Sequence, residues 1–211
     1  ALQWAFLFNQ VQEIEGEYVR SQGVFDQLFF PYYDADLRGG RLTRAQAGEL
    51  IHCFFDKFAA QHFGAGNNIC FGGRDAAGND LCNDLTRLCL EVFAERKMID
   101  PKLTLRVHRN SPPDILARAA DAVRGGANSI VFANDDVAFD MFVRHGKRPD
   151  DIADFVAIGC YEPAIMGREL SCTMSALCNL AKPLEELMRT SPPPRDMGDV
   201  LRGYESILAG H

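Results

Sequence analysis

Three short apolar runs alternate with two helical patterns between residues 103 and 159, and this alternation constrains the fold more than any other feature. The runs cover 103–108, 129–133 and 154–159. Pro112-Pro113 introduces the first helical segment, Asp114 to Arg124, which Gly125-Gly126 ends; the second covers Val137 to His145. Strands that alternate with helices pair in parallel through crossover connections. We therefore expect all three runs in one parallel sheet of an α/β fold.

Further helices flank this unit on both sides. Apolar spacing near 3.6 residues predicts them, and Thr43 is a typical N-cap for the second. The predicted helices are 2–18, 44–63, 83–96, 175–189 and 199–208. The segment from Gly72 to Asp80 is so rich in Gly, Asp and Asn that it predicts turns.

Composition excludes several classes of function. The net charge of −7 and the pI near 5.2 argue against a nucleic-acid-binding or anionic-membrane surface. No apolar stretch approaches the roughly 18 residues of a membrane span, and no signal peptide opens the chain. The seven cysteines include no CxxC pair, and the spacing of Cys172 and Cys178 fits no standard zinc site. A cytoplasmic protein with reduced thiols and no bound metal is expected.

The segment Ile158-Gly159-Cys160-Tyr161-Glu162-Pro163 is the strongest candidate for chemistry. At the end of an extended strand, Cys160 and Glu162 would leave the same face while Tyr161 points away. Gly159 leaves room beside the thiol, and Pro163 is expected to end strand pairing. A thiol and a carboxylate that converge in this way form a plausible catalytic pair. The alternative is a small buried cysteine with a solvated neighbour.

Three further polar residues lie in the predicted strands or directly after them. Arg106 and His108 lie on one strand face, where they could reach a substrate cavity or pair with buried acids. Asn134 ends the next strand and could line the cavity or cap the helix that follows. We expect these residues to be candidate substrate-binding groups, with both alternatives open.

The Gly-Cys-x-Glu-Pro segment resembles the thiyl-radical loop of glycyl radical enzymes, the pyruvate formate-lyase superfamily. Other segments resemble that family in the same order along the chain. They are Phe25-Asp26-Gln27, Phe30 to Leu37, Arg41 to Ala47, Gly72 to Asp80, Leu105 to His108, Phe132 to Asp135 and Asn179 to Glu185.

This resemblance implies the fold and the partners. Residues 1–211 would be a portion of a single domain, part of a ten-stranded α/β barrel with flanking helices and with Cys160 on a loop inside it. The cofactor would be an organic glycyl radical on a segment outside this chain, because Gly198, Gly203 and Gly210 lack the Arg-Val-x-Gly-Tyr flanks of the radical site. A radical-SAM activating enzyme, a small-molecule substrate and a full-length homodimer are expected, and this chain alone would be inactive.

The resemblance also implies the roles of Cys160 and Glu162. Cys160 would lose its hydrogen atom to the glycyl radical, and the resulting thiyl radical would abstract hydrogen from a substrate carbon. Glu162 would act as the general base, giving elimination, as in a dehydratase or lyase, or decarboxylation. A neutral thiol suits this chemistry, and no His or Lys lies near Cys160 in the sequence.

Departures from the family patterns narrow the reaction. Gly159 replaces the first of two adjacent cysteines found in pyruvate formate-lyase, which disfavours an acyltransferase. Met174 stands where the diol dehydratase and choline lyase branches have a substrate-contacting aspartate, so Met174 is expected to line a less polar substrate site. A non-catalytic homologue or subunit without a radical, and an enzyme that uses Cys160 as a nucleophile, remain alternatives.

Overall fold

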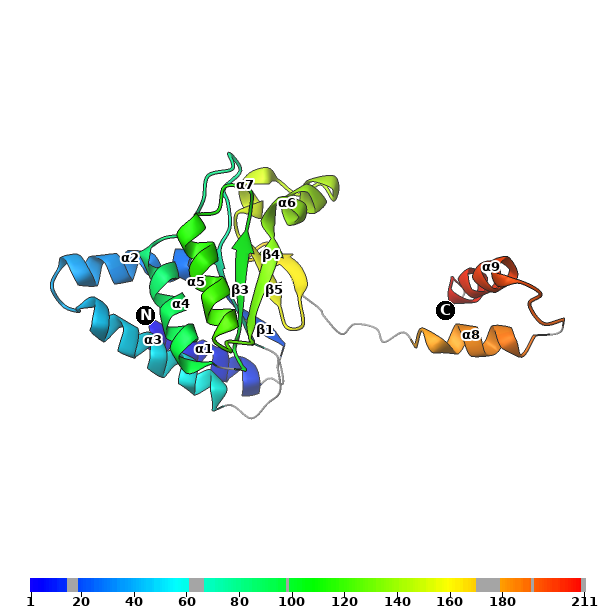
Figure 1. The fold of residues 1–211 in the computed structure, drawn as a ribbon, viewed down its shortest axis with the longest axis horizontal. Coiled ribbons are helices and arrows are strands. Elements are labelled where there is room, and N and C mark those ends of the chain that lie inside the picture. The colour runs from blue at the N-terminus through cyan, green and yellow to red at the C-terminus, as the bar shows by residue number, and fades with distance from the viewer. Residues whose placement is uncertain (15–18, 61–66, 98, 170–178, 191, 210–211) are drawn as a thin grey trace. The chain divides into compact units, whose positions relative to one another are not determined.

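The computed structural model describes the chain except for residues 15–18, 61–66, 98, 170–178, 191 and 210–211 (Figure 1). The chain divides into two compact units, residues 1–173 and residues 174–211. Each unit is described by itself below. Among the described residues, no helix combines the length and the apolar character needed to cross a membrane.

The first unit is built on a four-stranded parallel sheet. Its strands lie in the order in which they occur along the chain: β1 (Arg20–Val24), β2 (Asn67–Gly72), β3 (Lys102–Val107) and β4 (Ile130–Asn134). The prediction that 103–108 and 129–133 are parallel strands is confirmed. Parallel neighbours require crossovers, and helices supply them here.

Helices cover one face of this sheet. They are α1 (Leu2–Ile14), α2 (Phe25–Arg38), α3 (Arg44–Ala59), α4 (Asp84–Arg96) and α5 (Pro113–Arg124), and α2 to α5 gather on one side of the strands in Figure 1. The sheet contributes Ile69, Phe71, Leu103 and Leu105 to the core beneath them. The residues that alternate with these, Asn68, Cys70, Thr104 and Arg106, lie on the opposite face, which we call the inner face.

Local signals in the sequence explain where α3 and α4 begin. Thr43 and Gln46 form a reciprocal capping box at the start of α3, as the sequence predicted. Asn83 and Thr86 form the same arrangement at α4. These caps satisfy amide groups that an α-helix leaves free in its first turn.

The third predicted strand does not join the parallel sheet. After α6 (Asp135–Arg144) and α7 (Pro149–Ile152), β5 (Phe155–Ile158) pairs antiparallel with β6 (Glu162–Ile165) in a separate two-stranded hairpin. The expectations that 154–159 is a parallel strand and that Pro163 ends pairing are wrong, since Pro163 lies opposite Ala157. A proline is tolerated in this strand because it can face an unpaired edge.

The hairpin lies across the inner face of the sheet. β5 begins where the Ala153 carbonyl accepts a hydrogen bond from Arg106, near the carboxyl end of β3. It ends where the Gly159 amide donates to the Arg20 carbonyl, at the amino end of β1. β5 therefore runs in the direction opposite to the sheet strands and carries its tip toward their amino ends.

The second unit contains two described helices, α8 (Ala181–Met188) and α9 (Met197–Leu208). The Tyr204 hydroxyl donates to the Leu180 carbonyl at 2.8 Å and joins them. Asp196 caps α9, which begins two residues before the predicted start. Residues 175–178 of the other predicted helix lie outside the described part of the chain.

Candidate active site

The tip of the β5–β6 hairpin carries Cys160. Ile158 and Glu162 are paired across the hairpin, so Gly159, Cys160 and Tyr161 form the turn. The Tyr161 amide donates to the Ile158 carbonyl at 2.9 Å. Cys160 is thus placed on a tight turn and not on the extended strand end that the sequence suggested, and its side chain is exposed.

Two residues of this turn have left-handed backbone angles. Gly159 has φ of +52°, and Tyr161 has φ of +133°. A Cβ atom at Gly159 would overlap Val19 Cγ1, so only glycine fits there. Tyr161 carries a side chain that disfavours a positive φ, so the contacts around it must hold its backbone in this conformation.

Glu162 folds back over the same turn. Its Oε2 atom accepts a hydrogen bond from the Tyr161 amide at 3.1 Å and lies 3.3 Å from the position of a Cβ on Gly159. The carboxylate is therefore bonded to the residue after Cys160 and lies near the residue before it. The thiol itself has no hydrogen-bond or ion-pair partner within the described part of the chain.

Tyr161 fills the space between the hairpin and the inner face. Its ring packs against two apolar clusters, one around Val156 and one around Phe155. Burial raises the pKa of its hydroxyl, which has no hydrogen-bond partner within the described part of the chain. The aromatic side chain points away from solvent, so the turn presents Cys160 on its free side.

Cys70 lies on the inner face beneath β5. Its sulfur accepts a hydrogen bond from the Ala157 amide at 3.2 Å, and burial raises the pKa of its thiol to about 11. A neutral, fully buried thiol of this kind supports the hairpin by packing and hydrogen bonding.

Arg106 anchors the beginning of the hairpin. Its guanidinium donates twice to Asp135, at 2.8 and 3.0 Å, and once to the Ala153 carbonyl at 2.8 Å. It also lies 5.2 Å from the centre of the Phe155 ring. Because the Arg106 side chain is fully buried, it pairs with an acid and does not reach a cavity in this arrangement.

The other predicted binding residues are also engaged. His108 Nε2 lies 3.1 Å from Asp80 Oδ1, again the acid-pairing alternative. Asn134 Oδ1 accepts from the Val137 amide at 3.2 Å and so caps α6. Met174 lies outside the described residues. Of the six candidate residues, Cys160 and Glu162 share the tip of the hairpin.

Asp26 and Asn68 are buried polar residues that were not predicted as functional. Asp26 Oδ2 accepts from the Gly72 amide at 2.8 Å and from the Thr86 hydroxyl at 2.5 Å, and burial raises the pKa of its carboxyl to about 6. Asn68 contacts the hairpin turn directly. The alternation of polar and apolar residues in β2 was the signal that could have revealed Asn68.

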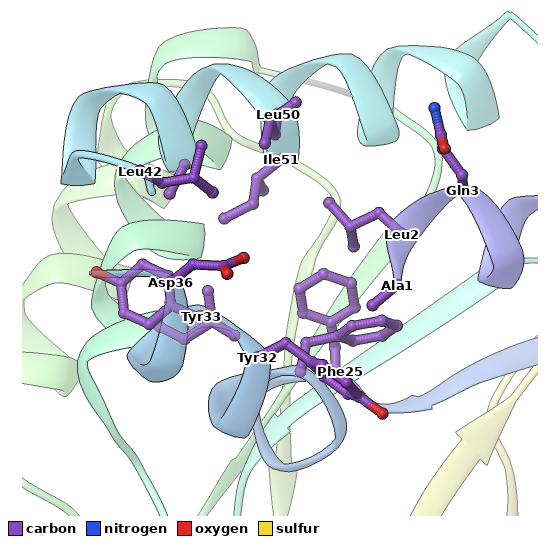
Figure 2. A pocket seen from close by; sticks show the side chains of 13 residues that line it. Ala1, Leu2, Gln3, Phe25, Tyr32, Tyr33, Asp36, Leu42, Leu50 and Ile51 are labelled. Atoms are coloured by element: carbon purple, nitrogen blue, oxygen red, sulfur yellow. The ribbon is translucent and has the colours of Figure 1, made fainter. Parts of the chain in front are cut away.

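A separate cavity lies in the helical layer. Side chains from α1, α2 and α3 converge on a pocket of about 300 Å³ (Figure 2). Its lining is largely apolar and includes Leu2, Phe25, Tyr33 and Ile51, but none of the candidate site residues. No group of three or more potential metal ligands occurs within the described ranges.

Comparison with known proteins identifies the family. The pyruvate formate lyase-like family matches residues 1–199. The chain belongs to this family. The family resemblance seen in the sequence is therefore confirmed, and membership implies a glycyl radical as the cofactor.

Curated relatives of this pyruvate formate lyase-like chain include lyases and dehydratases. An isethionate sulfite-lyase of Desulfovibrio desulfuricans is 29% identical over 95% of this chain and 26% of its own length. A (2S)-3-sulfopropanediol dehydratase of Klebsiella oxytoca is 29% identical over 90% of this chain and 26% of its own. The chain thus spans about a quarter of the length of these relatives.

Solved structures agree on the fold. A glycyl radical enzyme from Archaeoglobus fulgidus superposes with a TM-score of 0.79 and 26% identity, over 92% of this chain and 29% of that one. A structure concerned with 1,2-propanediol dehydration in Roseburia inulinivorans superposes with a TM-score of 0.79 and 27% identity, over 89% of this chain and 27% of that one. The α/β segment with its parallel sheet matches part of their barrels, as expected from the sequence.

The hairpin turn fits a glycyl radical cofactor held by another segment. Cys160 is exposed, and its thiol has no partner among the described residues.

Proposed function

We propose that this chain is part of a longer glycyl radical enzyme in which Cys160 carries the thiyl radical and Glu162 is the general base. The observation that carries the proposal is the hairpin turn. There the Glu162 carboxylate accepts from the Tyr161 amide and lies near Gly159, the two residues that flank an unpartnered, exposed thiol. The Gly-Cys-x-Glu-Pro segment acts as the thiyl loop.

The bound glycyl radical would supply the acceptor for the hydrogen atom of the Cys160 thiol. The Cys160 sulfur radical then takes a hydrogen atom from a substrate carbon that bears a hydroxyl, and the thiol is restored. Glu162 removes the proton from that hydroxyl, and a leaving group departs with its bonding electrons from the neighbouring carbon. The product radical finally takes back the hydrogen atom of Cys160, so the sulfur radical is regenerated.

The relatives favour elimination, in a dehydratase or lyase, over other outcomes, with decarboxylation as the second candidate. The lyase and dehydratase names of the curated relatives support elimination, and a 4-hydroxyphenylacetate decarboxylase subunit of Clostridioides difficile, 26% identical over 67% of this chain, supports the second. Gly159 disfavours the acyltransferase alternative, because a second cysteine is absent from the turn.

The substrate is a small organic molecule. Met174 lies outside the described residues and stays a candidate for its site on the sequence alone. We propose that three residues support this site without touching the substrate. Arg106 and His108 do so through their acid partners, and Asn134 does so as the cap of α6. A radical-SAM enzyme activates the full-length homodimer in the cytoplasm.

The test is substitution of Cys160 in the full-length protein after anaerobic activation. Cys160→Ala should abolish turnover and leave the glycyl radical signal in electron paramagnetic resonance unchanged, because that radical forms before the thiol reacts. Cys53→Ala, which removes an exposed thiol on α3, is the matched control and should retain turnover. Turnover by Cys160→Ala would refute the proposal and favour a non-catalytic role for the loop.

A further inference from the structure

A buried polar pair on the inner face contacts the peptide group that precedes Cys160. Asn68 Nδ2 donates to the Gly159 carbonyl oxygen at 2.6 Å. Thr104 Oγ1 donates to Asn68 Oδ1 at 2.7 Å. Both side chains are fully buried, and they come from adjacent strands of the parallel sheet.

The first contact fixes the orientation of a peptide plane. The Gly159 carbonyl and the Cys160 nitrogen belong to one planar group, so a hydrogen bond to that oxygen sets the direction in which the Cys160 Cα leaves the plane. The peptide group on the other side of Cys160 is fixed within the hairpin, where the Tyr161 amide donates to Ile158 and Glu162. The peptide groups on both sides of Cys160 are thus hydrogen-bonded, and Asn68 is the partner that comes from outside the hairpin.

The second contact fixes Asn68. The Gly159 carbonyl can only accept, so Asn68 must present its NH2 group there and its oxygen elsewhere. Thr104 satisfies that oxygen. Without the Thr104 hydroxyl the oxygen would be a buried acceptor without a partner, and the amide would lose one of its two constraints.

The strained backbone of Tyr161 explains why the turn needs the Asn68–Thr104 pair. A non-glycine residue at φ of +133° persists only where surrounding contacts determine its conformation. A turn without the Asn68 contact would be free to relax, and the thiol would move with it. Reactions between positioned groups are sensitive to displacements of about 1 Å.

We infer that Asn68 and Thr104 are positioning residues that fix the Cys160 thiol for hydrogen-atom transfer, acting through the Gly159 peptide group. The inference rests on the proposed function for the role of the thiol. The anchoring itself is a property of the hairpin.

The experiment uses the full-length protein with Thr104→Val, which keeps the side-chain shape, Thr104→Ser, which keeps the hydroxyl, and Asn68→Leu. In Thr104→Val, amide hydrogen exchange of the segment 155–165 should rise about fivefold, as loss of one hydrogen bond implies. After activation, kcat should fall about tenfold with KM within about twofold, because Thr104 lies beneath the turn and not in the substrate site. Thr104→Ser should restore both, and Asn68→Leu should exceed Thr104→Val in both.

Ser111→Ala is the matched control, since it removes a buried hydroxyl that accepts from the His108 amide, in the segment after the same strand. It should leave exchange of 155–165 and kcat unchanged. Exchange at the wild-type rate in Thr104→Val, or raised exchange with unchanged kcat, would overturn the inference. The exchange measurement needs no radical. If Cys160→Ala retained turnover, the proposed function would be refuted, but the exchange result would still test whether Asn68 and Thr104 fix the turn.

Discussion

Arg106 and Asp135 form a buried two-point ion pair, with 2.8 Å between Nε and Oδ1 and 3.0 Å between Nη2 and Oδ2. The pair joins the end of β3 to the start of α6, and the remaining Arg106 nitrogen holds the chain at Ala153 as it enters the hairpin. A guanidinium is required, because an ammonium group cannot make three directed contacts of this planar kind.

Arg106→Lys should therefore lower the free energy of unfolding by about 3 kcal/mol, because breaking a buried pair leaves a carboxylate poorly compensated. Chemical denaturation of the full-length protein measures this. Arg109→Lys changes an exposed arginine that pairs with Asp136 and should cost at most about 1 kcal/mol. Equal effects of the two substitutions would contradict a special role for Arg106.

Glu162→Gln should lower turnover about 100-fold, since the amide keeps the shape but cannot accept a proton. Exchange of hydrogen between substrate and Cys160, followed with deuterated substrate, should continue because that step needs no base. Glu169→Gln is a suitable control, as Glu169 also accepts a backbone amide, that of Ile165. Near-normal turnover of Glu162→Gln would make the carboxylate structural and favour a different base.

Gly159→Ala should destabilise the hairpin more than Gly167→Ala. Both glycines have positive φ, +52° and +72°, so both substitutions carry a conformational cost of about 1–2 kcal/mol. A Cβ at Gly159 would additionally overlap Val19, whereas Gly167 has open space. Amide hydrogen exchange of 155–165 measures the difference, and similar exchange in the two variants would be inconsistent with this packing.

Asp26 should make stability fall as pH rises from about 4 to about 6. Its carboxyl has a pKa of about 6 in the folded protein, raised by burial from 3.8. In that window the folded state retains a proton that the unfolded state has lost. The free energy of unfolding therefore falls as pH rises, by roughly 3 kcal/mol over the whole window. The difference in unfolding free energy between the wild type and Asp26→Asn isolates this effect. Parallel pH profiles would show that Asp26 does not titrate in this range.

The sequence predicted helices and strands well where the signals are local. Thr43 marks the start of α3, and Pro112-Pro113 and Gly125 bound α5, because these residues act on the backbone next to them. The helix 83–96 was likewise confirmed within one residue. Such signals need no knowledge of the rest of the fold.

Strands β1 and β2 were not predicted, and in β2 the two faces meet different environments. In β2, Ile69 and Phe71 face the helices, while Asn68 and Cys70 face the hairpin. This alternation covers only residues 68–71, and the polar Asn67 precedes it, so the strand signal is short and weak. Asn68 has its hydrogen-bond partner 91 positions away, at Gly159.

The residues proposed for the site come from a sequence motif, but their geometry could not be predicted from it. Cys160 and Glu162 follow from the motif, yet the turn that joins them depends on pairing between β5 and β6. The pattern of 154–159 is equally compatible with a parallel strand. Which partner such a run takes is decided by tertiary contacts, here those of Arg106 at one end and Asn68 at the other.

The long separation between Asn68 and Gly159 has a consequence for the order of folding. Contacts between distant residues form late, because closing the intervening chain costs entropy that only an assembled structure repays. β2 and β3 must already be paired before Thr104 and Asn68 can receive the hairpin. A nascent or partly unfolded chain therefore holds Cys160 in no fixed direction, and only a chain that has completed its sheet is competent to direct a reactive sulfur.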